Sequence, residues 1–254
     1  MRLLLSNDDG ILARGLAALE RAAERIGEVF VVAPDREQSA TSHSLTMHHP
    51  LRPVQISERR WQVDGTPTDC VMLAIEALVG DNRPDFVLSG VNHGPNMGED
   101  VLYSGTVAAA MEGLALGIPS IAFSFAGSVL RADALMDDHV GTIERIVRHI
   151  TTLPDLPEST LFNVNIPPIA ASQVKGVRLT RLGRRVFSDS LTKMKDPWGR
   201  PIYWIGGGSV SWQGSTADSD FQAIADGYVS VTPLHLDLTH RKVLDTAEQW
   251  WRPL

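Results

Sequence analysis

The sequence predicts an α/β protein with a Rossmann-like, three-layer, doubly wound and mostly parallel sheet. Short apolar runs recur along the first 125 residues, segments with helical spacing of apolar side chains separate them, and several runs stop at Asp, Asn or Gly. Continuous apolar runs are typical of strands buried in parallel sheets, and their alternation with helices is typical of doubly wound folds. The 254 residues, 43% of them hydrophobic, are enough for a sizeable core, so we expect one domain over residues 1–254.

The first unit is a strand, a helix and a second strand. Leu3–Leu5 forms the first apolar run, Leu16–Ile26 carries apolar side chains at helical spacing, and Val29–Ala33 forms the second run. The polar, Ser-rich segment Pro34–His49 that follows is too long for an ordinary crossover turn. We therefore expect it to be a functional loop.

The middle of the chain contains a well-marked helix start. Thr66 is expected as the N-cap and Pro67 at the first helical position, with the helix running to about Val79. The other elements expected in this part are a small surface hairpin of Arg52–Ile56 and Arg60–Val63, strands at Asp85–Ser89 and Ser120–Phe125, and a helix at Thr106–Leu116 ended by Gly117.

The pattern loosens toward the C-terminus. The elements expected there are a helix over Leu135–Leu153, strands at Leu161–Ile166, Val177–Leu182 and Tyr228–Thr232, and a C-terminal tail from His235 to Leu254. The segment Gly183–Asp220 is rich in Gly, Trp, Ser and charge and does not resemble a self-sufficient core. It is interpreted as a β-hairpin extension used in oligomerisation or as a long surface hairpin, and composition alone leaves both open.

Composition limits the classes of partner. The formal net charge of −7 argues against a nucleic-acid polymer or an anionic membrane as the main partner, because both reward clustered Lys and Arg. The lone cysteine, Cys70, excludes an intrachain disulfide and is interpreted as a packed core thiol, and the 8 histidines show no zinc-site spacing. With no secretory signal pattern and no apolar run long enough to span a membrane, we expect a cytoplasmic protein.

Two adjacent carboxylates, Asp8 and Asp9, follow the first strand within the sequence Ser-Asn-Asp-Asp-Gly. Open α/β sheets bind ligands at the carboxyl ends of their strands, and neighbouring carboxylates repel each other unless a cation lies between them. A hard divalent cation is the usual solution. The alternative is that one Asp caps the next segment while the other is solvated, since Asp and Gly are ordinary turn residues.

A Gly-rich polar loop, Ser89–Asp100, follows another expected strand. Asn92 and Asn96 could offer amide oxygens to a hard cation such as magnesium, manganese or calcium. The alternative is that both Asn residues only supply turn geometry.

The same loop leads into a small-residue helix start at Tyr103–Ala110. Free amides there, with the hydroxyls of Ser104 and Thr106, form an anion site suited to phosphate. Ser39 adds a hydroxyl from the loop after the second strand. Because all three loops leave strands at the same edge of the predicted sheet, we expect them to converge on one crevice.

Several of these motifs resemble those of the SurE family over about the first 125 residues, and more loosely to the C-terminus. The motifs are Ser6–Gly10, Ala33–Arg36, Ser42–Thr46, Gly65–Cys70 and Ser89–Gly113. The resemblance implies a divalent-metal-dependent 5′-nucleotidase that hydrolyses nucleoside 5′- and 3′-monophosphates to nucleoside and phosphate. It also implies exopolyphosphatase activity on short polyphosphate.

The resemblance carries over to individual residues. It implies one divalent ion per subunit, Mg²⁺ or Mn²⁺, and contacts to the substrate phosphate. The implied metal ligands are Asp8, Asp9, Ser39 and Asn92, and the implied phosphate contacts are Asn96, Ser104, Gly105 and Thr106. Ala40 departs from the pattern, because many relatives carry Gly there. The family forms homodimers or homotetramers with exchanged C-terminal segments, which favours the oligomerisation interpretation of residues 183–220.

The expected mechanism is attack on phosphorus by a water held by the metal, with Asp8 or Asp9 holding or deprotonating that water. Attack by an aspartate itself is the alternative. The histidines nearest the crevice are His43, His48 and His93, of which His43 is our named candidate for an acid–base role, without an assignment of the general acid. The polar loop Ser39–His49 is the expected place for base recognition.

A nucleotide-binding or sensor protein without catalysis is the alternative function. Against it, the first strand is not followed by Gly-x-Gly-x-x-Gly, and the chain has no P-loop Gly-Lys-Ser/Thr. A serine hydrolase is disfavoured because Gly-x-Ser-x-Gly is absent from the sequence.

Overall fold

The computed structural model describes residues 1–154, 156–157, 160–187, 191–205, 210–213 and 216–251. A nine-stranded sheet runs through the described part of the chain. Its strands, in spatial order, are β3 (Pro53–Ser57), β4 (Arg60–Val63), β2 (Glu28–Pro34), β1 (Arg2–Ser6), β5 (Phe86–His93), β6 (Ser120–Phe125), β7 (Leu161–Ile166), β13 (Val229–Leu234) and β8 (Val177–Leu179). Strands β4 to β7 pair in parallel, while β3 and β13 introduce antiparallel pairs with β4 and β7.

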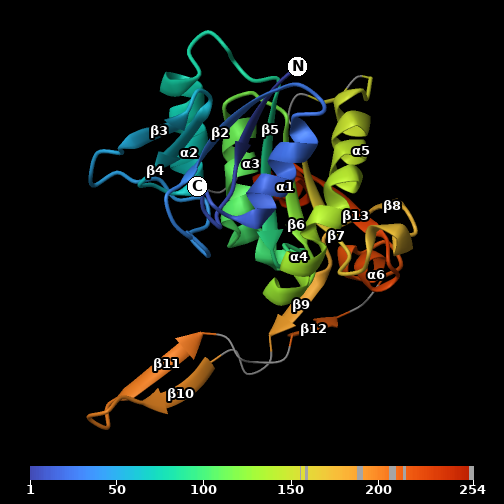
Figure 1. The fold of residues 1–254 in the computed structure, drawn as a ribbon. Helices are drawn as coiled ribbons and strands as arrows, with labels where there is room; N and C mark the ends of the chain where they lie inside the picture. Colours follow the sequence, from blue (N-terminus) through green and yellow to red (C-terminus); the bar gives the residue numbers. More distant parts are fainter. Residues whose placement is uncertain (155, 158–159, 188–190, 206–209, 214–215, 252–254) are drawn as a thin grey trace.

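Helices cover both faces of this sheet (Figure 1). The larger core on one face includes α1 (Arg14–Ala23) and α5 (Val140–Thr151), and the core on the other includes α2 (Pro67–Leu73) and part of α3 (Gly105–Ala115). The remaining helices are α4 (Val129–Leu135), α6 (Asp220–Ala225) and α7 (Arg241–Trp251), with short helical turns η1 (Ala74–Leu78), η2 (Gly98–Leu102), η3 (Met136–His139) and η4 (Ala171–Gln173). The predicted three-layer, mostly parallel α/β fold is confirmed.

Strand β1 shows why its sequence is a continuous apolar run. Successive side chains of a strand point to opposite faces, and here both faces are covered. Leu3 and Leu5 lie in the core beside α1, whereas Leu4 lies in the core beside α2, and all three are fully buried. The run ends where the chain leaves the sheet at the two aspartates.

The predicted start of α2 is confirmed in detail. Thr66 Oγ1 accepts a hydrogen bond from the Asp69 N–H at 3.1 Å, and Asp69 Oδ2 accepts one from the Thr66 N–H at 2.8 Å, which is a reciprocal capping box. The helix continues as the π-helical turn η1 and ends at Val79. Cys70 on this helix is buried and unpaired, as a packed thiol should be, and burial raises the pKa of its thiol.

Four expected elements differ from the structure. Strand β4 joins the main sheet in parallel with β2, so the segment is more than a surface hairpin. The expected helix over residues 135–153 is broken at η3, where the His139 ring is buried and contacts the Ile169 carbonyl at 2.8 Å. Strand β8 stops at Leu179. The expected C-terminal tail contains helix α7, whose apolar side chains at Val243, Leu244 and Trp250 follow a helical period.

Residues 184–187, 191–205 and 210–213 form a projection that we call the arm. Its base pairs β9 (Arg184–Phe187) with β12 (Val210–Gln213), and its far end pairs β10 (Leu191–Lys195) with β11 (Pro201–Ile205), both antiparallel. Figure 1 shows the β10–β11 hairpin projecting away from the sheet. The predicted C-terminal hairpin is therefore present, and its use in oligomerisation stays a prediction.

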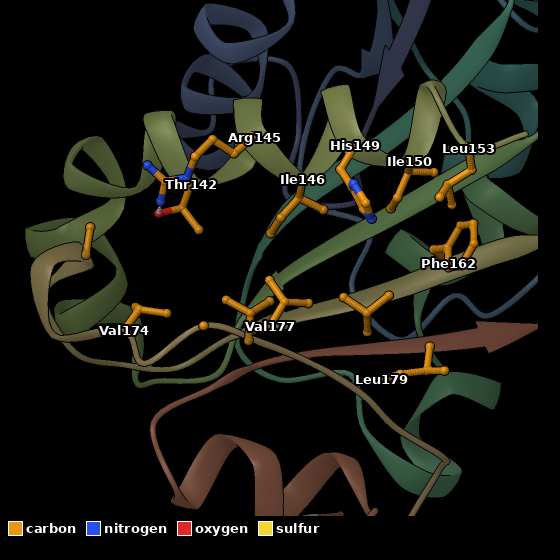
Figure 2. Close-up of a pocket in the computed structure, with 14 residues that line it drawn as sticks. Thr142, Arg145, Ile146, His149, Ile150, Leu153, Phe162, Val174, Val177 and Leu179 are labelled. Carbon is orange, nitrogen blue, oxygen red and sulfur yellow. Dashed lines mark hydrogen bonds between the residues drawn. The ribbon is translucent and has the colours of Figure 1, made fainter.

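An apolar cavity of about 540 Å³ lies between α5 and the strands β7, β13 and β8 (Figure 2). Ile146, Ile150 and Phe162 are among its lining residues, and Arg145 and His149 are the titratable ones. Its lining includes no carboxylate, so it has neither an acid–base pair nor the oxygen donors of a metal site. No helix in the described part of the chain combines the length and the apolar character needed to cross a membrane.

Candidate active site

A polar cleft of about 470 Å³ lies at the carboxyl ends of β1, β2 and β5. Its lining includes six of the predicted site residues, and these are Asp8, Asp9, Ser39, Asn92, Asn96 and Ser104. Gly105 and Thr106, the other two predicted phosphate contacts, follow Ser104 at the start of α3. They do not line the cleft, but both contact Asp8. The structure therefore brings the three predicted loops together at one edge of the sheet.

The two carboxylates differ in their surroundings. Asp8 is 4% exposed, and burial raises its pKa to about 6, with the neighbouring negative charge of Asp9 adding to the rise. The Thr106 hydroxyl and backbone N–H act in the opposite direction by donating hydrogen bonds to the Asp8 carboxylate. A cation beside the pair would offset the cost of burying the Asp8 charge and the smaller repulsion by Asp9, and so would lower this pKa.

The turn after β1 places both aspartates at the cleft. Asn7 Nδ2 donates to the Gly10 carbonyl at 2.9 Å, and the Gln38 N–H donates to the Asp8 carbonyl at 2.7 Å. Gly10 has φ +99°, and a Cβ at that position would lie 3.1 Å from the carbonyl carbon of Arg36. Only glycine fits this turn without strain, because the left-handed region and the close backbone both disfavour a side chain.

The start of α3 lines the cleft and also contacts Asp8. Ser104 is the N-cap, and its Oγ accepts from the Val107 N–H at 3.1 Å. Thr106, predicted to contact phosphate, is fully buried and gives its hydroxyl hydrogen bond to Asp8. A Cβ at Gly105 would lie 2.7 Å from the Asp8 Cβ, so the helix approaches the carboxylate as closely as a glycine allows. Ser104 lines the cleft, and the N–H of Gly105, the first residue of α3, has no acceptor within the helix, so these two groups are the candidates for contacting an anion.

Ser39 and Asn92 present oxygen atoms to the cleft. Asn92 Nδ2 donates to the Gly94 carbonyl at 2.9 Å, which leaves the amide oxygen free for a cation. Ser39 Oγ donates its proton to Glu37 Oε1 at 2.7 Å. The lone pairs of this oxygen are therefore available to a cation. Glu37 also lines the cleft, and its position two residues before Ser39 was the only sequence signal for it.

Asn96 is fixed by a buried polar network that the sequence did not reveal. Its N–H donates to Asn165 Oδ1 at 2.9 Å, and its carbonyl accepts from Nδ2 of Asn163 and of Asn165. Its side-chain Nδ2 donates to Ser124 Oγ at 2.8 Å. Because a serine hydroxyl can also donate, the amide can turn over and present its NH₂ to a phosphate while Ser124 donates to the oxygen.

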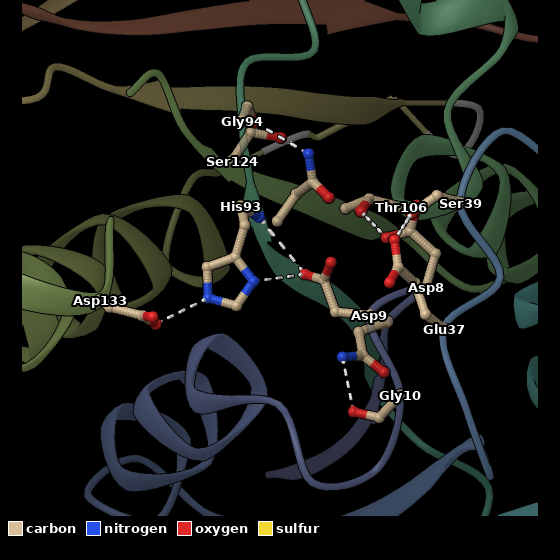
Figure 3. Close-up of polar contacts among 12 residues, drawn as sticks. Asp8, Asp9, Gly10, Glu37, Ser39, His93, Gly94, Thr106, Ser124 and Asp133 are labelled. Carbon is tan, nitrogen blue, oxygen red and sulfur yellow. Dashed lines mark hydrogen bonds and ion pairs between the residues drawn. The ribbon is translucent and has the colours of Figure 1, made fainter. Parts of the chain in front are cut away.

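His93 joins the acidic pair to α4. Its Nδ1 lies 3.3 Å from Asp9 Oδ2, and its Nε2 lies 3.5 Å from Asp133 Oδ1 (Figure 3). The Asp9 carboxylate raises the pKa of His93 through this hydrogen bond. His43, by contrast, pairs with Glu112 at 2.8 Å and is not among the residues that line the cleft. Asp133 carried no sequence signal, since nothing local links it to His93.

The donors in this cleft fit a hard divalent cation. They are two carboxylates, a hydroxyl and an amide oxygen, which magnesium and manganese prefer over softer ligands. Burial raises the pKa of Asp8, and the charge of Asp9 adds to the rise, so a cation there would favour the ionised form of a carboxylate that is otherwise costly to bury. No group of three or more His, Cys, Asp and Glu side chains suited to a metal occurs among the described residues, in keeping with a ligand set that is half Ser and Asn.

The family model described as "Survival protein SurE" matches residues 3–189 of this chain. The chain belongs to the SurE family. Among relatives, a protein of Gemmatimonas aurantiaca named 5′-nucleotidase SurE is 73% identical over 99% of both chains. One of the same name from Vibrio cholerae serotype O1 is 48% identical over 98% of this chain and 97% of its own. The predicted membership of the SurE family is thereby confirmed.

A solved SurE structure supports the fold independently. The crystal structure of the SurE protein from Aquifex aeolicus superposes with a TM-score of 0.86 at 42% sequence identity. The match covers 98% of this chain and 99% of that one. The SurE fold thus extends through the C-terminal part of the chain, where the sequence pattern was weakest.

Proposed function

We propose that this protein is a divalent-metal-dependent 5′-nucleotidase that hydrolyses nucleoside monophosphates to nucleoside and phosphate. The observation that carries the proposal is the meeting of the Asp8–Asp9 pair with the start of α3 in one cleft. Full-length similarity to relatives named 5′-nucleotidase SurE supports the same activity. Hydrolysis of 3′-monophosphates and short polyphosphate belongs to the same proposal, since it uses the same phosphate site.

Asp8, Asp9, Ser39 and Asn92 would hold one Mg²⁺ or Mn²⁺ ion per subunit. Such an ion neutralises charge on the phosphoryl oxygens and lowers the pKa of water. The protein's contribution is to hold hard oxygen donors at the end of a rigid strand. The tight packing of Gly105 against Asp8 fixes the first of these donors.

Phosphate binding is assigned to the groups that remain open to the cleft. The Ser104 hydroxyl and the Gly105 N–H donate to phosphate oxygens, with the positive end of the α3 dipole behind them. Asn96 adds its NH₂ when the amide is turned toward the ligand. Thr106 acts indirectly, by orienting Asp8.

Of the two carboxylates, Asp9 is the one placed to hold or deprotonate an attacking water. Asp8 is more deeply buried and is bound to Thr106, whereas the Asp9 side chain is 13% exposed and uses one oxygen for His93. Attack by water forms a new P–O bond and breaks the ester P–O bond; Asp9 accepts a proton from the water, and the released nucleoside alkoxide takes up a proton from solvent. A solvent-oxygen label found in the Asp8 or Asp9 carboxylate after a single turnover would contradict this mechanism and favour attack by aspartate.

The activity is tested by phosphate release from AMP, GMP, CMP and UMP, with Mg²⁺, with Mn²⁺ and with chelator. We expect turnover that depends on the metal and that falls at least a thousandfold in Asp9→Asn. Asp138→Asn, which removes a carboxylate outside the cleft lining, is the control. Nucleotide binding without turnover under any metal would favour the sensor alternative.

The assembly is part of the same proposal. The arm exposes Trp198, Tyr203, Trp204 and Ile205, the last to 89%, and a homodimer or homotetramer that covers these side chains accounts for them. To test the assembly, residues 191–205 are replaced by a short Gly-Ser turn and the mass in solution is measured by light scattering. We expect the variant to form a smaller assembly than the wild type. A cytoplasmic location remains an expectation from the sequence.

A further inference from the structure

The cleft combines a polar floor with an apolar rim. Tyr103 and Val129 both line it and remain 61% and 57% exposed, respectively. Tyr103 follows η2, and Val129 is the first residue of α4, so the two come from separate segments of the chain. Exposed apolar side chains at the mouth of a polar cleft are typical of a site whose ligand has both a charged and a flat apolar part.

The backbone of Tyr103 is fixed while its ring is free. Ser42 Oγ donates to the Leu102 carbonyl at 2.6 Å, and the Tyr103 N–H donates to the Asp100 carbonyl at 3.0 Å. Within the part of the chain that the structure describes, the Tyr103 ring makes no hydrogen bond or ring contact with another side chain. A rigid backbone that carries an uncommitted aromatic ring is a preorganised stacking surface.

Position along the chain brings this ring within reach of a nucleobase. Tyr103 directly precedes Ser104, the cap of the helix start assigned to phosphate, and consecutive Cα atoms are about 3.8 Å apart. A nucleotide separates its base from its phosphate by one sugar. The loop expected to read the base, Ser39–His49, contributes only Ser39 and Ala40 to the described cleft lining.

We propose that Tyr103 is the stacking surface for the nucleobase, with Val129 as its apolar companion at the rim. The inference rests on the proposed nucleotidase function and specifies its substrate class. Neither side chain offers an amide that could read a base edge, and every base has a π-face, so the site accepts purines and pyrimidines alike. It favours both over phosphate monoesters that lack an aromatic group.

The test compares kcat/KM for AMP and for UMP with kcat/KM for glycerol phosphate, in the presence of Mg²⁺. In Tyr103→Ala, we expect the kcat/KM for each nucleotide, divided by that for glycerol phosphate, to fall at least about fivefold. This factor corresponds to the lower end of the free energy of stacking between a base and an aromatic side chain. Tyr103→Phe retains the ring and should keep the wild-type ratio. Leu130→Ala, next to Val129, exposed to 84% and absent from the cleft lining, is the control for a change on α4.

The outcomes separate this inference from the function on which it rests. If the wild type hydrolyses all three substrates and Tyr103→Ala keeps the wild-type ratio, the stacking role is wrong and the nucleotidase stands. If the wild type hydrolyses none of them with any metal, the proposed function is wrong. In that case, calorimetry measures the dissociation constants of AMP and glycerol phosphate for the wild type and for Tyr103→Ala. A preference for AMP that is unchanged in Tyr103→Ala would show that the stacking role is wrong.

Discussion

The Thr106 hydroxyl donates a hydrogen bond to the Asp8 carboxylate and ties the first turn of α3 to the end of β1. A hydrogen bond to a charged group contributes about 1.5–3 kcal/mol, and this one favours the ionised form that a cation requires. The pair therefore links the helix that faces the phosphate to the proposed metal site.

Removing that hydroxyl should weaken metal binding. In Thr106→Val, which keeps the shape of the side chain, we expect the calorimetric dissociation constant for Mn²⁺ to rise about tenfold or more, because ionised Asp8 loses its buried donor. Thr106→Ser restores the hydroxyl and should restore most of the affinity. Wild-type affinity in Thr106→Val would show that the bond does not support the metal site.

The buried Asp8 carboxyl should make the metal-free protein less stable as pH rises. Its pKa in the folded state is about 6, above the unfolded value of 3.8, so the folded state holds the proton more tightly. The resulting stabilisation is complete below about pH 4 and is lost as pH rises through 6, a change of about 3 kcal/mol.

Urea unfolding in chelator, at pH 4.5 and pH 7.5, checks this linkage against Asp8→Asn. Titratable groups away from the cleft contribute equally to both proteins, so the difference between them isolates Asp8 together with its coupling to Asp9 and His93. We expect Asp8→Asn to gain about 2 kcal/mol or more of stability relative to wild type between the two pH values. A constant difference would contradict the raised pKa.

His93 should titrate in response to the metal. The hydrogen bond that the His93 ring donates to the Asp9 carboxylate raises the pKa of His93 in the metal-free protein, and a cation bound at Asp9 would compete with the protonated ring for that carboxylate. We therefore expect NMR titration to show a lower pKa for His93 after Mg²⁺ is added. The signal of His149, on α5 and outside the cleft, should not respond.

Asp220 connects the start of η2 to Gly183, the residue before the arm. Fully buried, it accepts hydrogen bonds from the N–H groups of Gly98, Gly183 and Phe221 at 2.8–2.9 Å. In Asp220→Asn only one side-chain oxygen remains, so at least one buried N–H loses its acceptor, and we expect a loss of about 1–3 kcal/mol in the free energy of unfolding. Asp226→Asn, which breaks the surface pair with Arg178, should change stability little by the same urea measurement.

Local signals explain how much of this molecule could be predicted. The capping box at Thr66 lies within four residues, and the burial of Leu3 to Leu5 follows from an uninterrupted apolar run. The meeting of Asp8, Ser39 and Asn92 follows from the rule that parallel strands end at one edge of the sheet. Each of these inferences needs only short sequence segments or topology.

The parts that could not be predicted depend on side chains far apart in the chain. Asn96 and Asn165 are separated by 69 residues, and Gly98 and Asp220 by 122, so no local pattern marks either contact. Thr106 was marked only as part of a polar helix start, and the hydrogen bond from its hydroxyl to Asp8, 98 residues away, had no local signal; its contact with phosphate stays a prediction. The break at His139 likewise depends on a carbonyl in another segment.

The buried state of Cys70 has a practical consequence for studying the arm. The chain contains no other cysteine, and this thiol is enclosed in the core. A cysteine introduced at Trp198, which is 79% exposed in the turn between β10 and β11 of the single chain, would be the one thiol outside the core, open to reagents wherever no second copy covers the arm. A fluorophore attached there would report the surroundings of the arm selectively, without a cysteine-free background having to be built first.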